Sequence, residues 1–440
     1  MYYGASTQRA VDNFVISGTV LPPVFHFSLA LLKRCAAIVN MELDLLDLDM
    51  AQAIAQAAQE VMEESFDEHL VVDVFQTGSG TSTNMNMNEV IATRANDILD
   101  GEPRTKGRVH PNDHVNKCQS SNDVIPTCIH VASMLLLRFK LRPVLEELRD
   151  ALTTKAEAWQ EIRKIGRTHL QDAVEMTLGQ EVSGFARQIE LALNRLEAVE
   201  PRLTPLALGG TAVGTGLGAH PEFAARTIAA MAEYLELPFT ETENHFEAQA
   251  SIDSVVELSG ALRTLAISLT KIANDIRWLG SGPRLGLGEI RLPALQPGSS
   301  IMPGKVNPVI PEVVVQVAAQ VVGNDAAIAW GGAGGYFQLN TMLPLVAQNV
   351  LESMELLANA AQALTEKCVQ GLIANEERCQ SNIARSLAIV TNLVPHIGYD
   401  RAAEIANRAY ESGQTIEEVA LAEGIMDAAE LHSVLFGEDR

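Results

Sequence analysis

The stretch QASIDSVVELSGALRTLAISLTKIANDIRWL, residues 249–279, decides the fold class. It contains no proline and one glycine, and its apolar residues return at helical spacing. At 1.5 Å per residue it predicts a single helix roughly 45 Å long. The stretches 171–199 and 341–368 have the same character. Helices of this length, with small residues along them, predict a bundle whose wide apolar surface packs against further copies of the chain.

The character of the sequence changes on both sides of this bundle. We predict an N-terminal region at 1–119, a central long-helix bundle at 120–376 and a small helical domain at 377–440. In the last of these, Thr415 and Glu418 form a capping-box pattern ahead of apolar residues, which predicts a helix start. The predicted fold class is mainly α, with a long central helical bundle, a smaller N-terminal region and a small helical C-terminal domain.

Shorter elements are expected in the N-terminal region. The segment 49–64 predicts a helix with Asp49 as its N-cap. The segment 71–123 is polar and rich in Gly, Ser, Thr and Asn, which predicts loops. Strand-like alternation is scarce, so we expect at most short strands, near the N-terminus.

Composition restricts the partners of the chain. It carries 32 Lys and Arg against 55 Asp and Glu, a net charge of −23, which should repel nucleic acid and anionic membranes. No run of 18 uncharged apolar residues occurs, and the start MYYGASTQRA does not resemble a secretory signal. The five cysteines are odd in number and lack CxxC spacing, so we expect free thiols and a cytoplasmic location.

The loop GSSIMPGKVN at 298–307 has the chemistry of a small-anion site. Lys305 supplies charge, Asn307 a directional donor, and either serine could take or give a proton. Glu312, just beyond, could orient a histidine from elsewhere or could be an exposed first-turn glutamate.

Two earlier blocks offer uncharged donors. TGSGTSTNMNMNEV at 77–90 and QSSND at 119–123 suit the binding of carboxylates by neutral hydrogen bonds, although solvated loops have the same composition. We expect Asp123 to cap a helix and not to touch a substrate. His110 and His114 invite a metal site, but the intervening proline and the absence of a matching glutamate argue against one.

Two further blocks are less specific. In GRTHLQDA, 166–173, His169 stands between a glycine turn and a long predicted helix, whose N-terminus would favour neutral imidazole and attract anions; a lone histidine is nevertheless more often structural. The GTGLGA run at 214–219 satisfies a dinucleotide-binding pattern, but no βαβ rhythm surrounds it. A tight glycine turn is the better interpretation.

Taken together, these blocks resemble the class II fumarases of the aspartase/fumarase superfamily. GSSIMPGKVN closely matches the signature of that superfamily, and GSGT, HPND, QSSND, GRTHLQDA and HIGYDRAAEIA extend the resemblance over nearly the whole chain. Aspartate ammonia-lyases tend to read QSTND and MPAKVN, whereas this chain reads QSSND and has Gly304. The resemblance therefore favours a fumarase.

The resemblance implies an activity and a set of roles. The activity is reversible hydration of fumarate to L-malate in the tricarboxylic acid cycle, through an aci-carboxylate intermediate and with neither metal nor organic cofactor. Ser299 would be the base that removes the C3 proton of malate, and His169, paired with Glu312, would activate a water. The implied substrate-binding residues are Ser79, Gly80, Thr81, Ser120, Ser121, Asn122, Thr168, Ser300, Lys305, Val306 and Asn307.

The resemblance also implies a secondary dicarboxylate site and an assembly. The secondary site would consist of His110, Pro111, Asn112 and Asp113. The assembly would be a homotetramer in which each active site draws residues from three subunits. The alternatives are aspartate ammonia-lyase activity and, from another class, a non-catalytic structural oligomer with the same fold.

Overall fold

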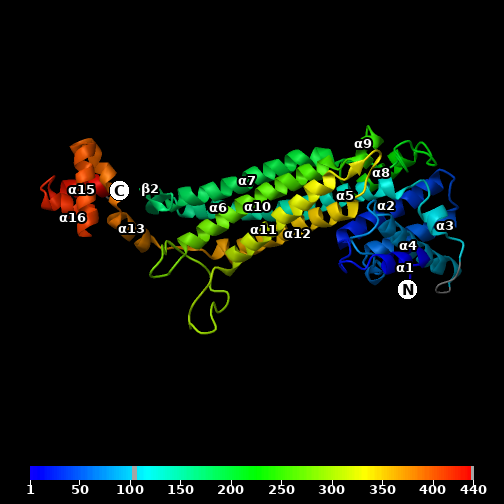
Figure 1. The fold of residues 1–440 in the computed structure, drawn as a ribbon, viewed down its shortest axis with the longest axis horizontal. Helices are drawn as coiled ribbons and strands as arrows, with labels where there is room; N and C mark the ends of the chain where they lie inside the picture. The colour runs from blue at the N-terminus through cyan, green and yellow to red at the C-terminus, as the bar shows by residue number, and fades with distance from the viewer. Residues whose placement is uncertain (102–106, 438–440) are drawn as a thin grey trace. The chain divides into compact units, whose positions relative to one another are not determined.

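The computed structural model describes residues 1–101 and 107–437, and helices dominate it (Figure 1). The prediction of a mainly α protein with long helices is confirmed. The α-helices are α1 (Ala5–Asn13), α2 (Pro23–Glu42), α3 (Leu48–Met62), α4 (Thr81–Asp100), α5 (Ser121–Leu136), α6 (Arg142–Ala158), α7 (Leu178–Leu203), α8 (Phe223–Leu235), α9 (His245–Ala250), α10 (Asp253–Leu279), α11 (Val309–Gly332), α12 (Leu343–Lys367), α13 (Glu376–Arg385), α14 (Val394–Ile397), α15 (Tyr399–Ser412), α16 (Ile416–Ala422) and α17 (Ala428–Phe436).

Short elements connect them. Single turns of 3-10 or π-helix are η1 (Asp67–His69), η2 (Pro111–Val115), η3 (Leu137–Leu141), η4 (Val369–Gly371) and η5 (Leu387–Leu393). The strands are β1 (Arg163–Thr168), β2 (Gln171–Thr177), β3 (Pro205–Leu206), β4 (Thr240–Glu241), β5 (Ile290–Arg291), β6 (Gly335–Tyr336), β7 (Leu339–Asn340) and β8 (Ile373–Ala374). They form four two-stranded pairs, of which only β3 with β4 is parallel.

Contacts divide the chain into two compact units. The first comprises 1–144, 192–267 and 316–360, and the second comprises 145–191, 268–315 and 361–440. The long helices α6, α7, α10, α11 and α12 contribute residues to both units. The division into 1–119, 120–376 and 377–440 stays a prediction.

The first unit is built around α2. Proline at the start of this helix has the fixed φ that a first helical position needs, and α3, α4, α5 and α8 pack against it. The predicted helix at 49–64 is present as α3, but Asp47 occupies the N-cap, so the assignment of the cap to Asp49 is wrong. Farther along, Asp325 of α11 accepts hydrogen bonds from Ser259 (2.7 Å) and Arg263 (2.6 Å) of α10. Such pairs fix the long helices of this unit against one another.

The prediction of loops throughout 71–123 is wrong, because α4 occupies twenty residues of it. Its Met87, Val90 and Ile91 are buried and give the helix an apolar face. The buried asparagines of α4 bond to other elements; Asn86, for example, accepts from the N–H of Val71 and donates to the carbonyl of His69. Their amides therefore do not compete with the helix for its own backbone, which is the usual reason that asparagine disfavours helices.

The second unit contains two further outcomes of the sequence analysis. The helix expected at 171–199 begins only at Leu178, because 171–177 forms strand β2 and pairs with β1. The first strand of the described residues is β1, so the expectation of short strands near the N-terminus is wrong. The last helices enclose a separate core that includes Leu393, Ile405 and Leu431. The capping box of Thr415 and Glu418 is confirmed at the start of α16.

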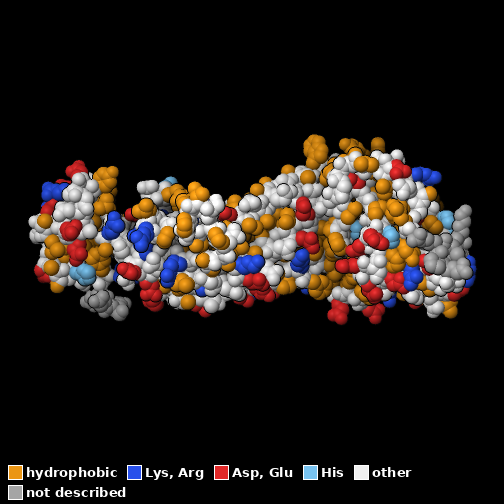
Figure 2. All heavy atoms as spheres, turned by 90° about the horizontal axis from the view of Figure 1, so that it is seen from below, with side chains coloured by type: hydrophobic (Ala, Val, Ile, Leu, Met, Phe, Trp, Pro, Cys, Tyr) orange, Lys and Arg blue, Asp and Glu red, His pale blue; other side chains and the backbone are white. Residues whose placement is uncertain are grey.

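Within residues 1–101 and 107–437, three helical stretches are long and apolar enough to cross a membrane by length and composition: Pro23–Glu42, Ser121–Ala158 and Val309–Gly332. In the first two, 72% of the most apolar window is buried inside the protein, whereas in the third only 33% is buried. We expected no membrane span because the sequence has no run of 18 uncharged apolar residues. That expectation stays a prediction. On α11, Val322 and Trp330 are exposed, and Figure 2 shows a face on which apolar and acidic side chains lie together.

His130 of α5 makes the stability of the first unit dependent on pH. Its Nδ1 lies 3.0 Å from the carbonyl of Pro205, which can only accept, so the proton sits there and Nε2 accepts from the hydroxyl of Ser254 at 2.7 Å. Burial lowers the pKa of His130 from 6.5 to about 4. Between these values the unfolded chain binds a proton that the folded chain does not, so stability falls as the pH drops from 6.5 to 4.

We expect His130→Gln, whose amide can make both bonds without titrating, to reduce this dependence by about one proton, or ~1.4 kcal/mol per pH unit. Urea unfolding at several pH values and one protein concentration measures the slope. An unchanged slope in the variant would contradict the assignment of a neutral, buried imidazole.

Candidate active site

In the first unit the structure brings together hydroxyls from two distant blocks. The hydroxyl of Ser79 lies 2.9 Å from that of Thr81, which in turn lies 2.7 Å from that of Ser121, forty residues later. Gly80 between the first two has φ +73, and a Cβ there would lie 2.9 Å from Ile125. This glycine allows the chain to turn tightly into α4 against α5. The result is a compact group of neutral donors.

The start of α5 is fixed by a buried carboxylate. Ser120 and Asp123 form a capping box, and the other oxygen of Asp123 accepts from the N–H groups of Gly209 (3.0 Å) and Thr211 (2.9 Å). Burial raises the pKa of Asp123, while these N–H donors favour its ionised form. The prediction that Asp123 caps a helix is confirmed. Asn122 reaches the same glycine-rich segment by donating to the carbonyl of Ala212 at 2.8 Å.

The predicted secondary site, His110 to Asp113, leads into the exposed π-helical turn η2. Nδ1 of His110 accepts from the N–H groups of Asn112 and Asp113, both at 3.3 Å. Nδ1 of His114 accepts from the N–H of His110 at 2.8 Å. Each histidine therefore supports the turn through its Nδ1. No group of three or more side chains able to hold a metal ion occurs in the described residues.

In the second unit the loop 298–307 is tied at its base. The N–H of Gly298 donates to the carbonyl of Lys305 at 2.7 Å, and the amide of Asn307 donates to the carbonyl of Gly298 at 2.9 Å. Ser300, Lys305 and Val306 are exposed on the loop. The sequence analysis did not foresee that Asn307 would use one of its donors to close the loop.

Backbone amides surround the hydroxyl of Ser299. Its Oγ accepts from the N–H of Ile301 at 3.2 Å and from the N–H of Met302 at 3.1 Å. Donors aimed at an oxygen stabilise its anion, because they supply part of the charge compensation that water would give. Two such donors would favour the alkoxide of Ser299, whose role as the base stays a prediction.

Lys305, Asn307 and Glu312 line one cavity of about 770 Å³ in the second unit. Two further cations line it, Arg277 in the last turn of α10 and Arg291 in β5. The sequence analysis missed both arginines. No motif marks them, and only the packing of this unit brings them to the wall of the cavity. The wall therefore carries three cations and one carboxylate, a surface suited to an anion.

His169 occupies a different setting from the one expected. Thr168 pairs with Gln171 across β1 and β2, and the two residues between them, His169 and Leu170, have φ of 56 and 60. Two consecutive left-handed residues form the tight turn of a β-hairpin. The expectation of a helix N-terminus at His169 is wrong, because the strand pairing continues to Thr177 before α7 begins. Thr168 and His169 are exposed at the tip.

The described residues show no hydrogen bond or ion pair between His169 and Glu312, so the implied pairing is not made within one chain. What fixes the hairpin is a set of charges at its base. Glu289, fully buried, accepts from Arg167 at 2.6 Å and lies 2.9 Å from Lys164. Despite its burial, these cations keep the pKa of Glu289 low.

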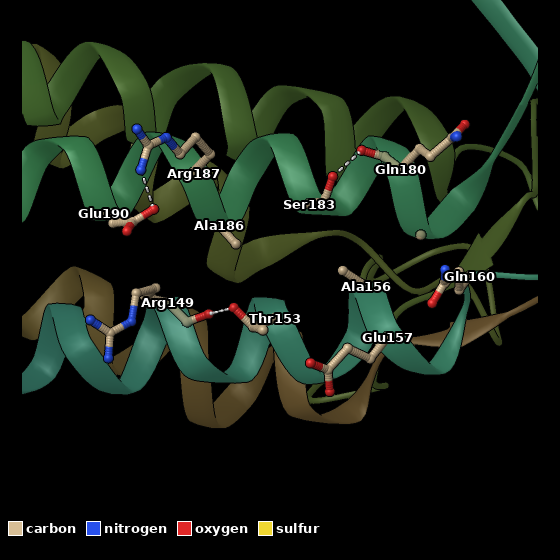
Figure 3. A pocket seen from close by; sticks show the side chains of 11 residues that line it. Arg149, Thr153, Ala156, Glu157, Gln160, Gln180, Ser183, Ala186, Arg187 and Glu190 are labelled. Atoms are coloured by element: carbon tan, nitrogen blue, oxygen red, sulfur yellow. Dashed lines mark hydrogen bonds and ion pairs between the residues drawn. The ribbon is translucent and has the colours of Figure 1, made fainter.

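A second cavity of about 530 Å³ lies between α6 and α7 (Figure 3). It contains none of the predicted site residues. Arg187 and Glu190 on its wall pair with each other at 2.5 Å, as do the hydroxyl of Ser183 and the carbonyl of Gln180 at 2.7 Å. Among the described residues, the side chains of Glu157 and Gln160 on its wall show no hydrogen bond or ion pair.

Comparison with known proteins decides the family. Residues 1–323 match a family model described as "Lyase", and residues 389–438 match "Fumarase C C-terminus". The class II fumarate hydratase of Nitrosomonas europaea is 54% identical over 97% of this chain and 92% of its own. The chain belongs to the class II fumarases. The resemblance inferred from the motifs is thus confirmed.

Two other members agree with this assignment. The human mitochondrial fumarate hydratase is 51% identical over 97% of this chain and 84% of its own. The crystal structure of a class II fumarase from Schistosoma mansoni superposes with a TM-score of 0.95 at 37% identity, over 99% of this chain and 95% of that one. The long helices and the paired short strands are therefore the fold of this family.

The tie at the base of the 298–307 loop generates a prediction. A Cβ on Gly298 would lie 2.6 Å from the carbonyl oxygen of Lys305, so Gly298→Ala must open the loop. A displacement of about 1 Å can cost on the order of 100-fold in rate. We expect a loss of that order in kcat/KM for the fumarase reaction, with the melting temperature little changed.

Gly304→Asn is the matched control. Gly304 has φ +80, which asparagine tolerates, and a Cβ there meets nothing within 4 Å. This variant should lose much less activity than Gly298→Ala. Equal losses in both variants would show that the tie itself has no special role.

Proposed function

We propose that the protein catalyses the reversible hydration of fumarate to L-malate, as its relatives in the class II fumarase family are named to do. The observation that carries the proposal is the loop 298–307, on which two backbone N–H groups hold the hydroxyl of Ser299, while Lys305 and Asn307 of the same loop line the cation-rich cavity. A carbon acid as weak as C3 of malate needs a strong base and a cation close to the carboxylate on which charge develops.

The residues divide the reaction into two duties. The alkoxide of Ser299 takes the C3 proton, while Lys305 and Asn307 hold the carboxylate that becomes the aci-carboxylate. His169, assisted by Glu312, protonates the departing hydroxyl and, in the hydration direction, activates water. The donors Ser79, Thr81, Ser121 and Asn122 bind the substrate carboxylates without adding charge.

We further propose that the active protein is a homotetramer whose sites are shared between copies. The exposed apolar side chains of α11 support an assembly, because a surface of this kind is usually covered by another subunit. The exposure of His169 at a hairpin tip supports the sharing of sites. We also propose that the protein is cytoplasmic, because its five cysteines are free and four of them are buried. We propose in addition that the reaction needs no cofactor.

The rival activities can be separated with the purified protein. Loss of the ultraviolet absorption of fumarate without ammonia supports the hydratase. Loss that requires ammonia would establish an aspartate ammonia-lyase instead. No loss in either mixture would leave the non-catalytic oligomer as the function of this fold.

Replacement of the proposed base is the direct test of the mechanism. Ser299→Ala should lower kcat by about 10²–10⁴-fold, because that is the usual contribution of a general base. Ser300→Ala serves as the comparison: no bond to the hydroxyl of Ser300 is found in the described residues, and we expect a smaller loss. Size-exclusion chromatography should show both variants assembled as the wild type. A near-normal kcat in Ser299→Ala would refute the assignment of the base.

A further inference from the structure

The most deeply buried cation of the first unit lies next to the substrate-binding blocks. Lys33 of α2 is 0% exposed. Its ammonium donates to the side-chain oxygens of Asn84 (2.7 Å), Gln119 (2.8 Å) and Asn116 (3.0 Å). An ammonium has three hydrogens, so these three amides satisfy it completely.

This arrangement is costly and unusual for a protein interior. All three acceptors are neutral, and the described residues show no ion pair between Lys33 and a carboxylate. A buried charge without an ionic partner is strongly disfavoured unless its surroundings are arranged to hold it. Burial lowers the pKa of Lys33 to about 7, although the charge of nearby Asp123 opposes the shift. A methionine of similar length would avoid this penalty.

The three amides belong to the segments that carry the candidate site. Asn84 lies one turn after Thr81 on α4, and Gln119 directly precedes Ser120. Asn116 closes the turn η2 by donating its own N–H to the carbonyl of Pro111 at 3.0 Å. One ammonium on α2 therefore connects the 79–81 donors, the 120–122 donors and the 110–113 turn.

Further bonds make the connection rigid. The oxygen of Asn116 also accepts from the amides of Asn84 (3.0 Å) and Asn88 (3.2 Å), and its own amide donates to the carbonyl of Gln119 at 3.1 Å. Because the ammonium form of Lys33 can only donate, it fixes which end of each amide faces inward. Reversing any one amide would place two donors against each other.

We propose that Lys33 is a positioning residue of the active site, which sets the spacing between the hydroxyls of α4 and those at the start of α5. The proposal rests on the proposed hydratase function. The hydroxyls of Thr81 and Ser121 are 2.7 Å apart, so a small shift of either segment breaks their contact and displaces both donors from the substrate carboxylate. Loss of Lys33 should therefore weaken substrate binding more than it slows the proton transfer at Ser299.

The test compares three single variants by KM, kcat and melting temperature. Lys33→Met removes the ammonium, and Gln119→Leu removes one acceptor and leaves the lysine in place. Lys140→Met is the matched control, since Lys140 is partly exposed and its one ion pair among the described residues is with Glu355. We expect kcat/KM to fall about 100-fold in Lys33→Met and about 10-fold in Gln119→Leu, mainly through KM, and to stay unchanged in Lys140→Met.

The double variant Lys33→Met/Gln119→Leu distinguishes positioning from general support of the fold. If both residues act through one network, the double variant should lose little more than Lys33→Met alone. The inference is overturned by a normal KM in the folded fraction of Lys33→Met. It is also overturned if the loss of kcat/KM in the double variant equals the product of the losses in the two single variants. Should Lys33→Met fail to fold, a normal KM in Gln119→Leu overturns it. A wild type inactive toward fumarate removes the proposed function and this inference together, whereas an active wild type with insensitive variants removes the inference alone.

Discussion

The group of hydroxyls formed by Ser79, Thr81 and Ser121 depends on the buried carboxylate of Asp123, which fixes the start of α5. One of its oxygens accepts the capping-box hydrogen bond at the start of α5. The other accepts hydrogen bonds from two N–H groups of the segment 209–211. A carboxylate removed from water needs such donors to stay ionised, so the segment cannot leave without a large cost. Asp123 therefore serves the fold, and together with Ser120 and Asn122 it fixes the start of α5, where the hydroxyl of Ser121 lies.

A protein of net charge −23 repels a dianionic substrate at long range, so the site needs local groups that offset this repulsion. The first unit does so with hydroxyls and amides, which accept an anion at short range and add nothing to the long-range field. The second unit places its cations locally, with Lys305, Arg277 and Arg291 around one cavity and a single carboxylate, Glu312, among them. In the proposed mechanism, this confines the attraction to the place where negative charge develops.

The sequence predicted those elements whose signal is local. Helices α10 and α12 follow from apolar periodicity, and the start of α16 follows from its capping box, because these patterns describe interactions within a few residues. Helix α4 was missed because its asparagines gain their bonds from other elements, such as Asn86 with the backbone near His69. The hairpin of β1 and β2 was missed for a related reason: strand pairing joins residues that a helical period cannot relate.

The candidate site also combines features that sequence motifs predict with contacts that only the folded chain shows. The motifs predicted Ser299, Lys305 and His169 as site residues, and their roles stay predictions. The bonds from the N–H groups of Ile301 and Met302 to Ser299 are local, two and three residues apart, but no motif announced them. The contacts of Lys33 could not be predicted from the sequence, because they join residues 51 to 86 positions apart. His169 lies at the exposed tip of a two-residue turn, and no side chain of the described residues forms a hydrogen bond or ion pair with it. This exposure supports the proposal that a neighbouring copy of the chain completes the site.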